Sequence, residues 1–390
     1  MNRSILAEAV PRGCFAWRKK GTTEGGGVLL GERGISMSKK ENIKRLWLEC
    51  FGDSPEYADM YFTQVYRDDN ALEMTDDEGR TVSSLQLADY EMLIEGRHAR
   101  LCYLCGATTA RRARGRGYMS RLMLRALDTA RERGAMMAAL IPAHDWLYFF
   151  FERFGFSDVY LADRQCFTSF HPFPTQQKYF PIDDPYAPEV YDSFRRYEEM
   201  RPGGVLHTKR DFLNVIDDLK FRRGGTFVAV GREDTPVAGM AWAFDCERFV
   251  QVNELLGIDE DARTGAMREL RKRFPDRQFT VLAPARDNTG RRLHSRGMGR
   301  LVNVEMCLSL IADANPDYKA VIRVYDPLLE KNSHTYELED GKCRINDDCR
   351  RKPDLDVTVD VLTRIVFSSP ATGDIVGFPS ERTHISLMLH

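Results

Sequence analysis

Residues 101–120 read LCYLCGATTARRARGRGYMS, and this stretch decides the fold. It begins with an apolar run, residues 101–107, of the length and composition of a buried β-strand. A loop rich in arginine and glycine follows at residues 111–117, and a helical pattern then runs from Tyr118 to Arg133 and stops at Gly134. The segment predicts a strand that leads through a basic loop into the N-terminus of a helix.

This loop has the chemistry of an anion site. Glycines let backbone N–H groups approach a phosphate, the first turn of a helix has unpaired N–H donors, and arginine supplies positive charge. A diphosphate suits this arrangement. Two other interpretations stay open. In the first, the short Arg-x-x-Gly-x-Gly string at residues 112–117 arises by chance in a chain with 29 glycines. In the second, the arginines between Arg111 and Arg125 form an RNA-binding patch.

The flanking sequence predicts the order of the other elements. Two amphipathic helices precede the segment, and strands with turn signals between them follow those helices. A further strand and an aromatic-rich helix come after Gly134, and proline-rich sequence then marks a linker. The predicted ranges are helices 38–50 and 56–66, strands 71–74, 81–93, 99–109 and 138–141, helix 146–154, and a linker over 171–188.

In order and spacing, these segments resemble the GNAT superfamily of acetyl-CoA-dependent N-acetyltransferases. The resemblance rests on the loop at 112–117, the helix after it, the strand at 138–141 and the sequence FFERFGF at 150–156. Residues 191–283 repeat the order helix, helix, strands, helix, strand without the basic loop. We therefore expect an α+β fold with tandem GNAT domains.

The end of the chain resembles a more particular type. Residues 300–304, 324–327 and 353–355 are similar to the sterol-carrier-like α/β domain of the Eis (enhanced intracellular survival) type of acetyltransferase. A strand is expected at 300–304 and a strand-like segment at 385–389. The expected divisions are a non-native or disordered leader at 1–36 with the true start at Met37, a first GNAT domain at 37–167, a second, degenerate one at 168–297, and the sterol-carrier-like domain at 298–390.

The resemblance implies a role for each residue of the cofactor site. Cys105, Gly106 and Ala107 would lie along the pantetheine arm of acetyl-CoA, with a backbone N–H polarising the thioester oxygen. The diphosphate would be bound by the loop and the first helical residues, namely Arg112, Ala113, Arg114, Gly115, Arg116, Gly117, Tyr118 and Met119.

The groups for proton transfer match the family less well. There, a tyrosine gives a proton to the departing thiolate and the C-terminal carboxylate takes one from the amine, so the α-carboxylate of His390 is the candidate base. Phe151 stands at the tyrosine position and has no proton to give. Tyr148, about one helical turn earlier, is the candidate substitute, and water as the acid or loss of catalysis are the alternatives. His144 is a further candidate for the substrate pocket.

Composition and charge narrow the range of partners. With 56 basic and 58 acidic residues the net charge is −2, which gives no chain-wide attraction to nucleic acid or anionic membrane. No apolar run approaches the roughly 20 residues of a transmembrane helix. Cys102 and Cys105 spell C-x-x-C, but on a strand their side chains point to opposite faces, so we expect buried thiols and no metal. These features favour a cytoplasmic protein.

The expected activity is transfer of an acetyl group from acetyl-CoA to a primary amine, on a small molecule or a lysine side chain, by direct attack in a ternary complex. The alternative is a catalytically weak or inactive protein that senses acyl-CoA or binds a ligand on the same fold. The resemblance also implies a homo-oligomer, hexameric in the Eis type.

Overall fold

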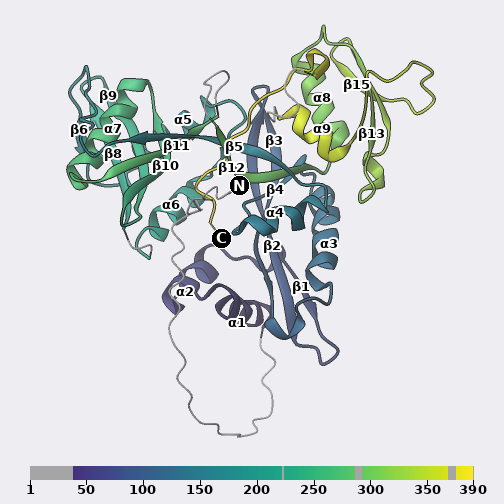
Figure 1. Cartoon of the computed structure of the whole chain (residues 1–390), viewed down its shortest axis with the longest axis horizontal. Helices are drawn as coiled ribbons and strands as arrows, with labels where there is room; N and C mark the ends of the chain where they lie inside the picture. Colours follow the sequence, from purple (N-terminus) through teal and green to yellow (C-terminus); the bar gives the residue numbers. More distant parts are fainter. Residues whose placement is uncertain (1–37, 222–223, 286–291, 368–374, 390) are drawn as a thin grey trace, which may run out of the picture.

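The computed structural model describes residues 38–221, 224–285, 292–367 and 375–389 (Figure 1). The expected leader, the proposed start at Met37 and the C-terminal His390 lie outside these ranges. Within them the fold is α+β, with one large sheet and a smaller one near the end of the chain. No helix in the described ranges is long and apolar enough to cross a membrane.

The fold begins with two helices whose starts are set by their caps. α1 (Lys39–Phe51) follows Ser38, which forms a capping box with Glu41. α2 (Pro55–Gln64) follows Ser54, whose side chain caps the helix, and has proline in its first turn. The next elements are β1 (Ala71–Thr75), β2 (Thr81–Ile94), β3 (Arg97–Thr109), α3 (Tyr118–Glu132), β4 (Met137–Leu140), α4 (Asp145–Glu152) and β5 (Ser157–Phe167).

The middle of the chain repeats the order helix, helix, strands, helix, strand, as the sequence predicted. The elements are β6 (Phe180–Ile182), α5 (Pro188–Glu199), β7 (Val205–Leu206), α6 (Lys209–Asp218), β8 (Gly225–Arg232), β9 (Thr235–Asp245), β10 (Phe249–Gly257), α7 (Glu260–Arg273) and β11 (Gln278–Pro284). The last part contains β12 (Leu293–Leu301), α8 (Val304–Ala314), β13 (Ala320–Tyr325), β14 (Thr335–Glu339), β15 (Lys342–Ile345), β16 (Leu355–Thr358) and α9 (Val359–Val366).

Two predicted strands near the end of the chain are wrong. The strand expected at 300–304 corresponds to β12, which ends at Leu301 and is followed by a helix from Val304. The prediction was misplaced because Gly297 and Gly299 interrupt the apolar pattern of β12. A Cβ at Gly299 would meet the end of the Met137 side chain and lie 3.0 Å from Cγ2 of Val159, so a larger residue there requires these side chains to move. The segment 385–389 is irregular and follows two isolated bridges.

The large sheet combines strands from distant parts of the sequence. Its order is β1-β2-β3-β4-β12-β5-β11-β10-β9-β8-β6, with β7 paired to β2. β12 lies between β4 and β5 and is antiparallel to both. β5 pairs with β12 and also with β11, so this long strand joins the two halves into one sheet (Figure 1). The expected boundary between 297 and 298 falls inside β12, and the division into domains stays a proposal.

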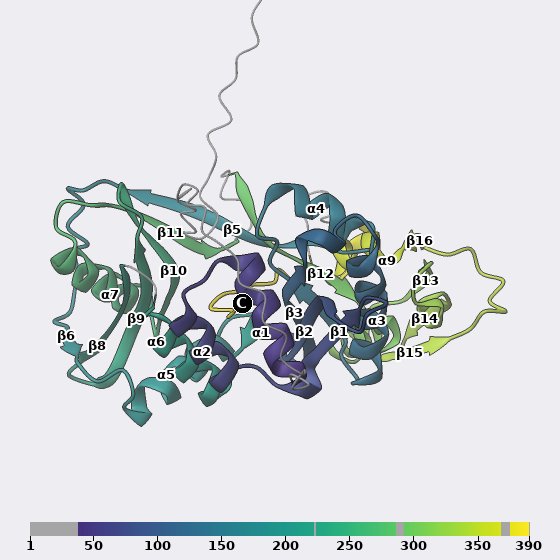
Figure 2. The same cartoon turned by 90° about the horizontal axis from the view of Figure 1, so that it is seen from below.

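Helices cover both faces of the first half of the sheet. Apolar residues of α3 and α4 pack on one face of β3 and β4, and those of α8 and α9 pack on the other. α1 and α2 share an apolar cluster with α5 and α6, which lie beside them in Figure 2. The N-terminal helices α1 and α2 therefore pack against helices of the second half and connect the two halves of the molecule.

The smaller sheet, of order β15-β14-β13-β16, is joined to the large one by a buried ion pair. Arg300 of β12 donates to Asp326, which follows β13, at 2.6 Å, and both side chains are fully buried. Asp326 also accepts hydrogen bonds from the backbone N–H groups of Leu328 and Leu329 and from the Asn332 side chain. This carboxylate organises the junction between the two sheets.

Removal of this carboxylate will destabilise the protein. Asp326→Ala leaves the Arg300 guanidinium buried without its counter-charge, which costs about 3–5 kcal/mol of unfolding free energy. Asp356→Ala is the matched control, because its ion pair with Arg323 is exposed and such pairs contribute about 0–1 kcal/mol. Urea unfolding of both variants measures the difference, and equal losses would contradict the prediction.

Candidate active site

β3 and β4 separate part-way along their length. They pair as parallel strands between residues 101–103 and 137–139, and β3 then continues to Thr109 without β4 beside it. β4 ends at Leu140, and the chain turns into α4. The edge of β3 beyond Tyr103 is therefore available to a ligand that forms backbone hydrogen bonds.

A β-bulge lies in the part of β3 that has left β4. The register with β2 shifts between the pairs Ser84–Thr108 and Gln86–Cys105, so β3 has one residue more than β2 here. Gly106 lies in this bulge with φ of +60°, a conformation that other residues rarely adopt. The bulge redirects the backbone N–H groups of the segment.

Side chains from α1, α2 and β2 pack behind the bulge. A Cβ on Gly106 would lie 2.8 Å from the indole ring of Trp47 and 2.9 Å from Nε2 of Gln86. Tyr61 donates to Oε1 of Gln86 at 3.4 Å, and its hydroxyl lies 3.7 Å from Sγ of Cys105. Sequence reasoning missed Tyr61 and Gln86, although a glutamine in an apolar strand was a signal for the second.

The arginine- and glycine-rich loop is open at the N-terminus of α3. It contains a 3₁₀ turn, residues 111–113, and two left-handed glycines, Gly115 at φ +77° and Gly117 at φ +76°. A Cβ on either glycine would meet no atom within 4 Å. The first turn of α3 has no side-chain cap and no acidic residue. Its N–H donors and the positive end of the helix dipole are therefore oriented to bind an anion.

Arginines surround this loop. Arg112 lies 3.7 Å from Asp76, and Nε of Arg114 donates to the carbonyl of Thr109 at 3.1 Å, so both side chains are placed beside the end of β3. The structure thus brings the predicted diphosphate residues to one surface. Arg112, Arg114, Gly115, Arg116 and Gly117 are exposed, Tyr118 and Met119 are half-buried, and Ala113 is buried.

α4 carries the residues considered for proton transfer. Phe151 is buried, with its ring 6.1 Å from that of Phe156. The hydroxyl of Tyr148 forms a hydrogen bond of 2.9 Å with the hydroxyl of Ser295 on β12, and Ser295 also donates to Asp158, so Tyr148 is tied to a strand from the end of the chain. His144 is exposed at the N-cap of α4. The roles of these residues stay predictions.

Cys102 and Cys105 are buried on opposite faces of the sheet, as predicted. They belong to different apolar clusters, and both are free. Burial raises the pKa of the Cys102 thiol to about 12 and that of Cys105 to about 11, so both are protonated at neutral pH. Among the described residues, no group of three or more His, Cys, Asp or Glu side chains is placed to bind a metal.

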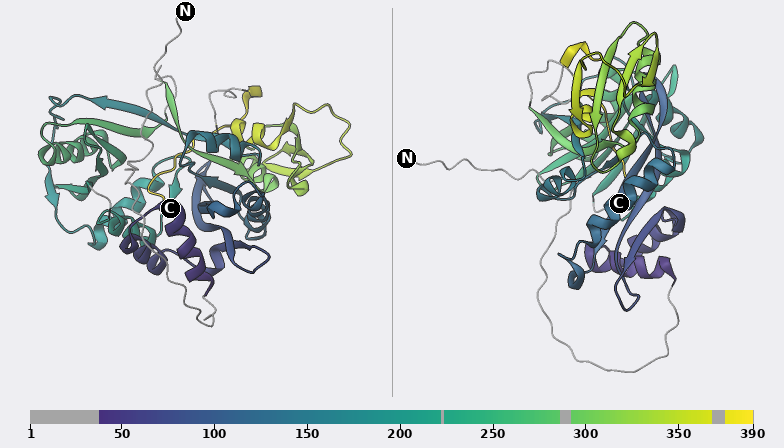
Figure 3. Two further views of the ribbon diagram at one scale, coloured as in Figure 1. Left: turned by 60° about the horizontal axis from the view of Figure 1, so that its bottom comes forward. Right: turned by 90° about the vertical axis from the view of Figure 1, so that its right-hand side faces the viewer.

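The C-terminal tail runs between the two halves of the molecule (Figure 2, Figure 3). Ile385 and Met388 belong to the apolar cluster shared with α8 and α9. Leu387 and Leu389 belong to the cluster of α1, α2, α5 and α6, which also contains Trp47. The buried tail therefore leads toward the helices that pack behind the Gly106 bulge.

A buried carboxylate on β10 binds the tail. Glu254 accepts hydrogen bonds from Arg201 at 2.8 and 3.0 Å, from Nε2 of His384 at 3.0 Å and from the hydroxyl of Ser386. Burial alone would raise the pKa of this carboxyl, but Arg201 and His384 hold it well below its usual range. Sequence reasoning missed this group, because Glu254 is 53 positions from Arg201 and 130 positions from His384 along the chain.

Residues 33–159 match the family model of the acetyltransferase (GNAT) domain. Residues 33–159 therefore form a GNAT acetyltransferase domain, a type of domain found in enzymes whose co-substrate is an acyl-CoA. The matched segment contains the splayed strands, the Gly106 bulge and the open loop.

Solved structures show a similar fold along most of the chain. Eis1 from Mycobacterium abscessus has 16% identity and a TM-score of 0.68, with 90% of this chain and 97% of that one covered. A GCN5-related N-acetyltransferase from Anabaena variabilis has 16% identity and a TM-score of 0.69, with 87% and 92% covered. A GCN5-related N-acetyltransferase from Kribbella flavida has 17% identity and a TM-score of 0.65, with 84% of this chain and 85% of that one covered. A search of curated proteins finds no match. The predicted resemblance to the Eis type is confirmed for the fold.

Substitution of Gly106 will cost more stability than substitution of a glycine with open surroundings. Gly106→Ala adds overpacking against Trp47, about 1–3 kcal/mol, to the cost of a side chain at positive φ. Gly79→Ala is the control, because Gly79 has φ of +75° and an added methyl group there would meet no atom within 4 Å. Urea midpoints measure the two losses, and similar values would show that the bulge tolerates a side chain.

Proposed function

We propose that the chain transfers an acetyl group from acetyl-CoA to a primary amine by direct attack within a ternary complex. The observation that carries this proposal is the continuous path from the splayed edge of β3, through the bulge at Gly106, to the uncapped N-terminus of α3. The strand edge suits the amides of a pantetheine arm, and the loop suits a diphosphate. In coenzyme A an extended arm with two amide groups is joined directly to a diphosphate, which is the combination that these two features suit.

The bulge supplies the electrophilic assistance. In the proposed complex a backbone N–H of the segment 105–107 donates to the thioester oxygen and stabilises the oxyanion that forms on attack. The amine lone pair forms a C–N bond with the carbonyl carbon, the C–S bond then breaks, and coenzyme A leaves as a thiolate that takes up a proton. The amine nitrogen loses a proton to a base.

The protonated thiols support direct attack. Cys105 is the cysteine within the proposed acyl site, and burial raises its pKa to about 11. A thiol in this state is a poor nucleophile at neutral pH, because the thiolate is the reactive form. An acyl-cysteine intermediate is therefore disfavoured, and the amine itself attacks the thioester.

The tail and α4 provide the candidate proton-transfer groups. The proposed base is the α-carboxylate of His390, supported by the buried path of the tail up to Leu389. The proposed acid is the phenol of Tyr148, because Phe151 at the usual position has no proton to give. The acceptor is a primary amine on a small molecule or a lysine side chain. The expected homo-oligomer stays a prediction.

A thiol-release assay tests the activity. The purified full-length protein, given acetyl-CoA and a panel of primary amines, is expected to release coenzyme A thiol only when an amine is present. Gly117→Val places a β-branched side chain at positive φ in the anion loop and is expected to raise the KM for acetyl-CoA about tenfold or more. Gly134→Val is the control, because Gly134 has φ of +75° with open space around it but lies at the far end of α3.

Binding of acetyl-CoA without thiol release across the whole panel would reject the enzymatic proposal. The same result would favour a protein that senses acyl-CoA.

The acid is tested on α4. Tyr148→Phe is expected to lower kcat about a hundredfold, the lower end of a general-acid contribution, with little change in KM. Ser295→Ala is the control for a positional role, because it removes the hydrogen bond to Tyr148 and keeps the phenol. Equal losses in the two variants would show that Tyr148 acts through its hydrogen bond to Ser295 and not as the acid. Phe151→Tyr is expected to raise kcat if the missing acid limits the rate.

The base is tested at the C-terminus. A short extension after His390 moves the α-carboxylate and is expected to lower kcat about tenfold or more, most strongly at low pH where unprotonated amine is scarce. His390→Ala keeps the carboxylate in place and is expected to preserve turnover. Unchanged kcat in the extended protein would remove the terminal carboxylate from the mechanism.

A further inference from the structure

The C-terminal tail contains a turn with a strained backbone conformation. Leu387 has φ of +55°, in the left-handed region that is costly for a residue with a side chain. The two residues after it pack in different places: Met388 belongs to the cluster of α8 and α9, and Leu389 belongs to the cluster of α1, α2, α5 and α6. Such a conformation persists only where the contacts around it enforce it.

The contact directly before this turn comes from Glu254 of β10. Its buried carboxylate accepts a hydrogen bond from the hydroxyl of Ser386, the residue that precedes Leu387. It also accepts one from Nε2 of His384 at 3.0 Å, so a single carboxylate binds the tail at two positions. Hydrogen bonds to an ionised carboxylate are stronger than those between neutral groups. Glu254 is therefore a strong anchor for the residues next to the turn.

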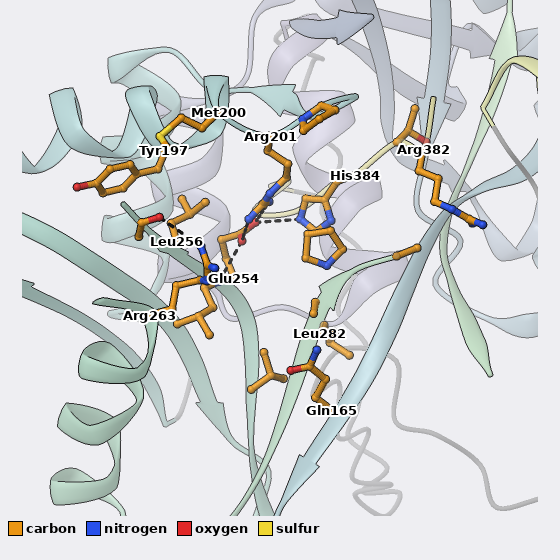
Figure 4. Close-up of a pocket in the computed structure, with 18 of the residues that line it drawn as sticks. Gln165, Tyr197, Met200, Arg201, Glu254, Leu256, Arg263, Leu282, Arg382 and His384 are labelled. Carbon is orange, nitrogen blue, oxygen red and sulfur yellow. Dashed lines mark hydrogen bonds and ion pairs between the residues drawn. The ribbon is translucent and has the colours of Figure 1, made fainter. Parts of the chain in front are cut away.

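The Glu254 carboxylate is itself held by Arg201, which follows α5. Figure 4 shows Glu254 between Arg201 and His384. The two terminal nitrogens of Arg201 donate to the two carboxylate oxygens at 3.0 and 2.8 Å. This bidentate pairing fixes the orientation of the carboxylate as well as balancing its charge. The anchor for the tail is thus rigidly placed in the second half of the molecule.

Apolar packing does not surround this part of the tail. A cavity of about 600 Å³ borders residues 380–384, and Arg201 and Glu254 also line it (Figure 4). Isolated bridges at Thr383 and His384 hold the backbone up to that point. The hydrogen bond from Ser386 to Glu254 extends the anchoring beyond the bridges, toward the end of the chain.

We propose that Glu254 is a positioning residue for the C-terminal carboxylate. By binding Ser386 it fixes the turn at Leu387, and the turn sets the direction of the chain end. The inference rests on the proposed function, in which the α-carboxylate of His390 takes a proton from the amine. A displaced tail would leave the reaction without its base, although acetyl-CoA could still bind to β3 and α3.

The turn directs the tail toward the proposed acyl site. Leu389 packs in the same apolar cluster as Trp47, the residue that occupies the space beside Gly106. Glu254 and Arg201 lie outside the segment 33–159 that matches the GNAT domain. The second half of the molecule therefore contributes to acetyl transfer by holding the tail.

Glu254→Asp tests the position of the carboxylate without removing its charge. Aspartate keeps the counter-charge for Arg201, but it is one methylene shorter and its carboxylate lies farther from the tail. With an amine identified by the thiol-release assay, we expect kcat to fall about tenfold or more and the KM for acetyl-CoA to change little. Glu260→Asp is the matched control and is expected to preserve kcat, because it shortens a glutamate in the same cavity wall that pairs with Arg263.

A short extension after His390 shows whether Glu254 acts through the terminal carboxylate. In the extended protein the carboxylate is already displaced, so we expect Glu254→Asp to cause less than about a twofold further loss of kcat. Additive losses would overturn the proposal, as would an unchanged kcat in Glu254→Asp alone or equal losses in Glu254→Asp and Glu260→Asp. Ser386→Ala serves if Glu254→Asp does not fold, because it removes one hydrogen bond and leaves the charge pair intact, and the same result is expected.

Hydrogen exchange distinguishes failure of this proposal from failure of the proposed base. In Glu254→Asp the amides of residues 385–389 are expected to exchange about tenfold faster, while those of α3 keep their rates. Unchanged exchange in the tail would overturn the proposal. An extension that leaves kcat unchanged would instead count against His390 as the base, and the exchange measurement does not depend on that result.

Discussion

The separation of β3 from β4 is the feature on which the rest of the site depends. Parallel pairing ends at Tyr103, and the left-handed Gly106 turns the strand so that its edge remains without a neighbour. Trp47 on α1 fills the space where a side chain at Gly106 would lie, so the N-terminal helix supports the bulge from behind. The chain then passes directly into the loop and α3. Strand edge, bulge and anion loop are thus positioned by one continuous backbone.

The site is completed by segments from the end of the chain. β12 inserts between β4 and β5, and its Ser295 contacts Tyr148 on α4. The tail crosses between the two halves, where Glu254 binds His384 and Ser386. The first half therefore does not form a closed unit, because its sheet lacks an inner strand until β12 has been added. Because β12 supplies this inner strand, we expect the matched GNAT segment to fold together with the rest of the chain.

The two halves use the same backbone geometry with different electrostatics. Each has parallel strands that separate next to a bulge, followed by a helix. At α3 the helix N-terminus is uncapped and surrounded by arginine, whereas at α7 it is capped by Asp259 and followed by acidic residues. The two helix N-termini therefore differ in charge, although the backbone geometry is repeated.

Much of the first site could be predicted from the sequence. The strand predicted at 99–109, the loop and α3 follow from local periodicity and from the positions of glycine and arginine. The burial of Cys102 and Cys105 on opposite faces follows from the strand period. The polar Gln86 in an apolar strand was a local signal, but its contact with Tyr61 behind the bulge could not be predicted, because no local pattern places either residue next to Gly106. β12 was placed too late in the chain, since its glycines carry no apolar pattern.

The sequence by itself determined most of the elements, the candidate anion loop and the class of chemistry, because capping, turn formation and helical or strand periodicity depend on residues a few positions apart. The tertiary structure alone decided where the tail runs, which residues bind it and that one sheet unites both halves. Arg201, Glu254 and His384 meet only after packing has brought α5, β10 and the tail together. Their pairing is enforced by the cost of burying an unpaired charge, which no local pattern encodes.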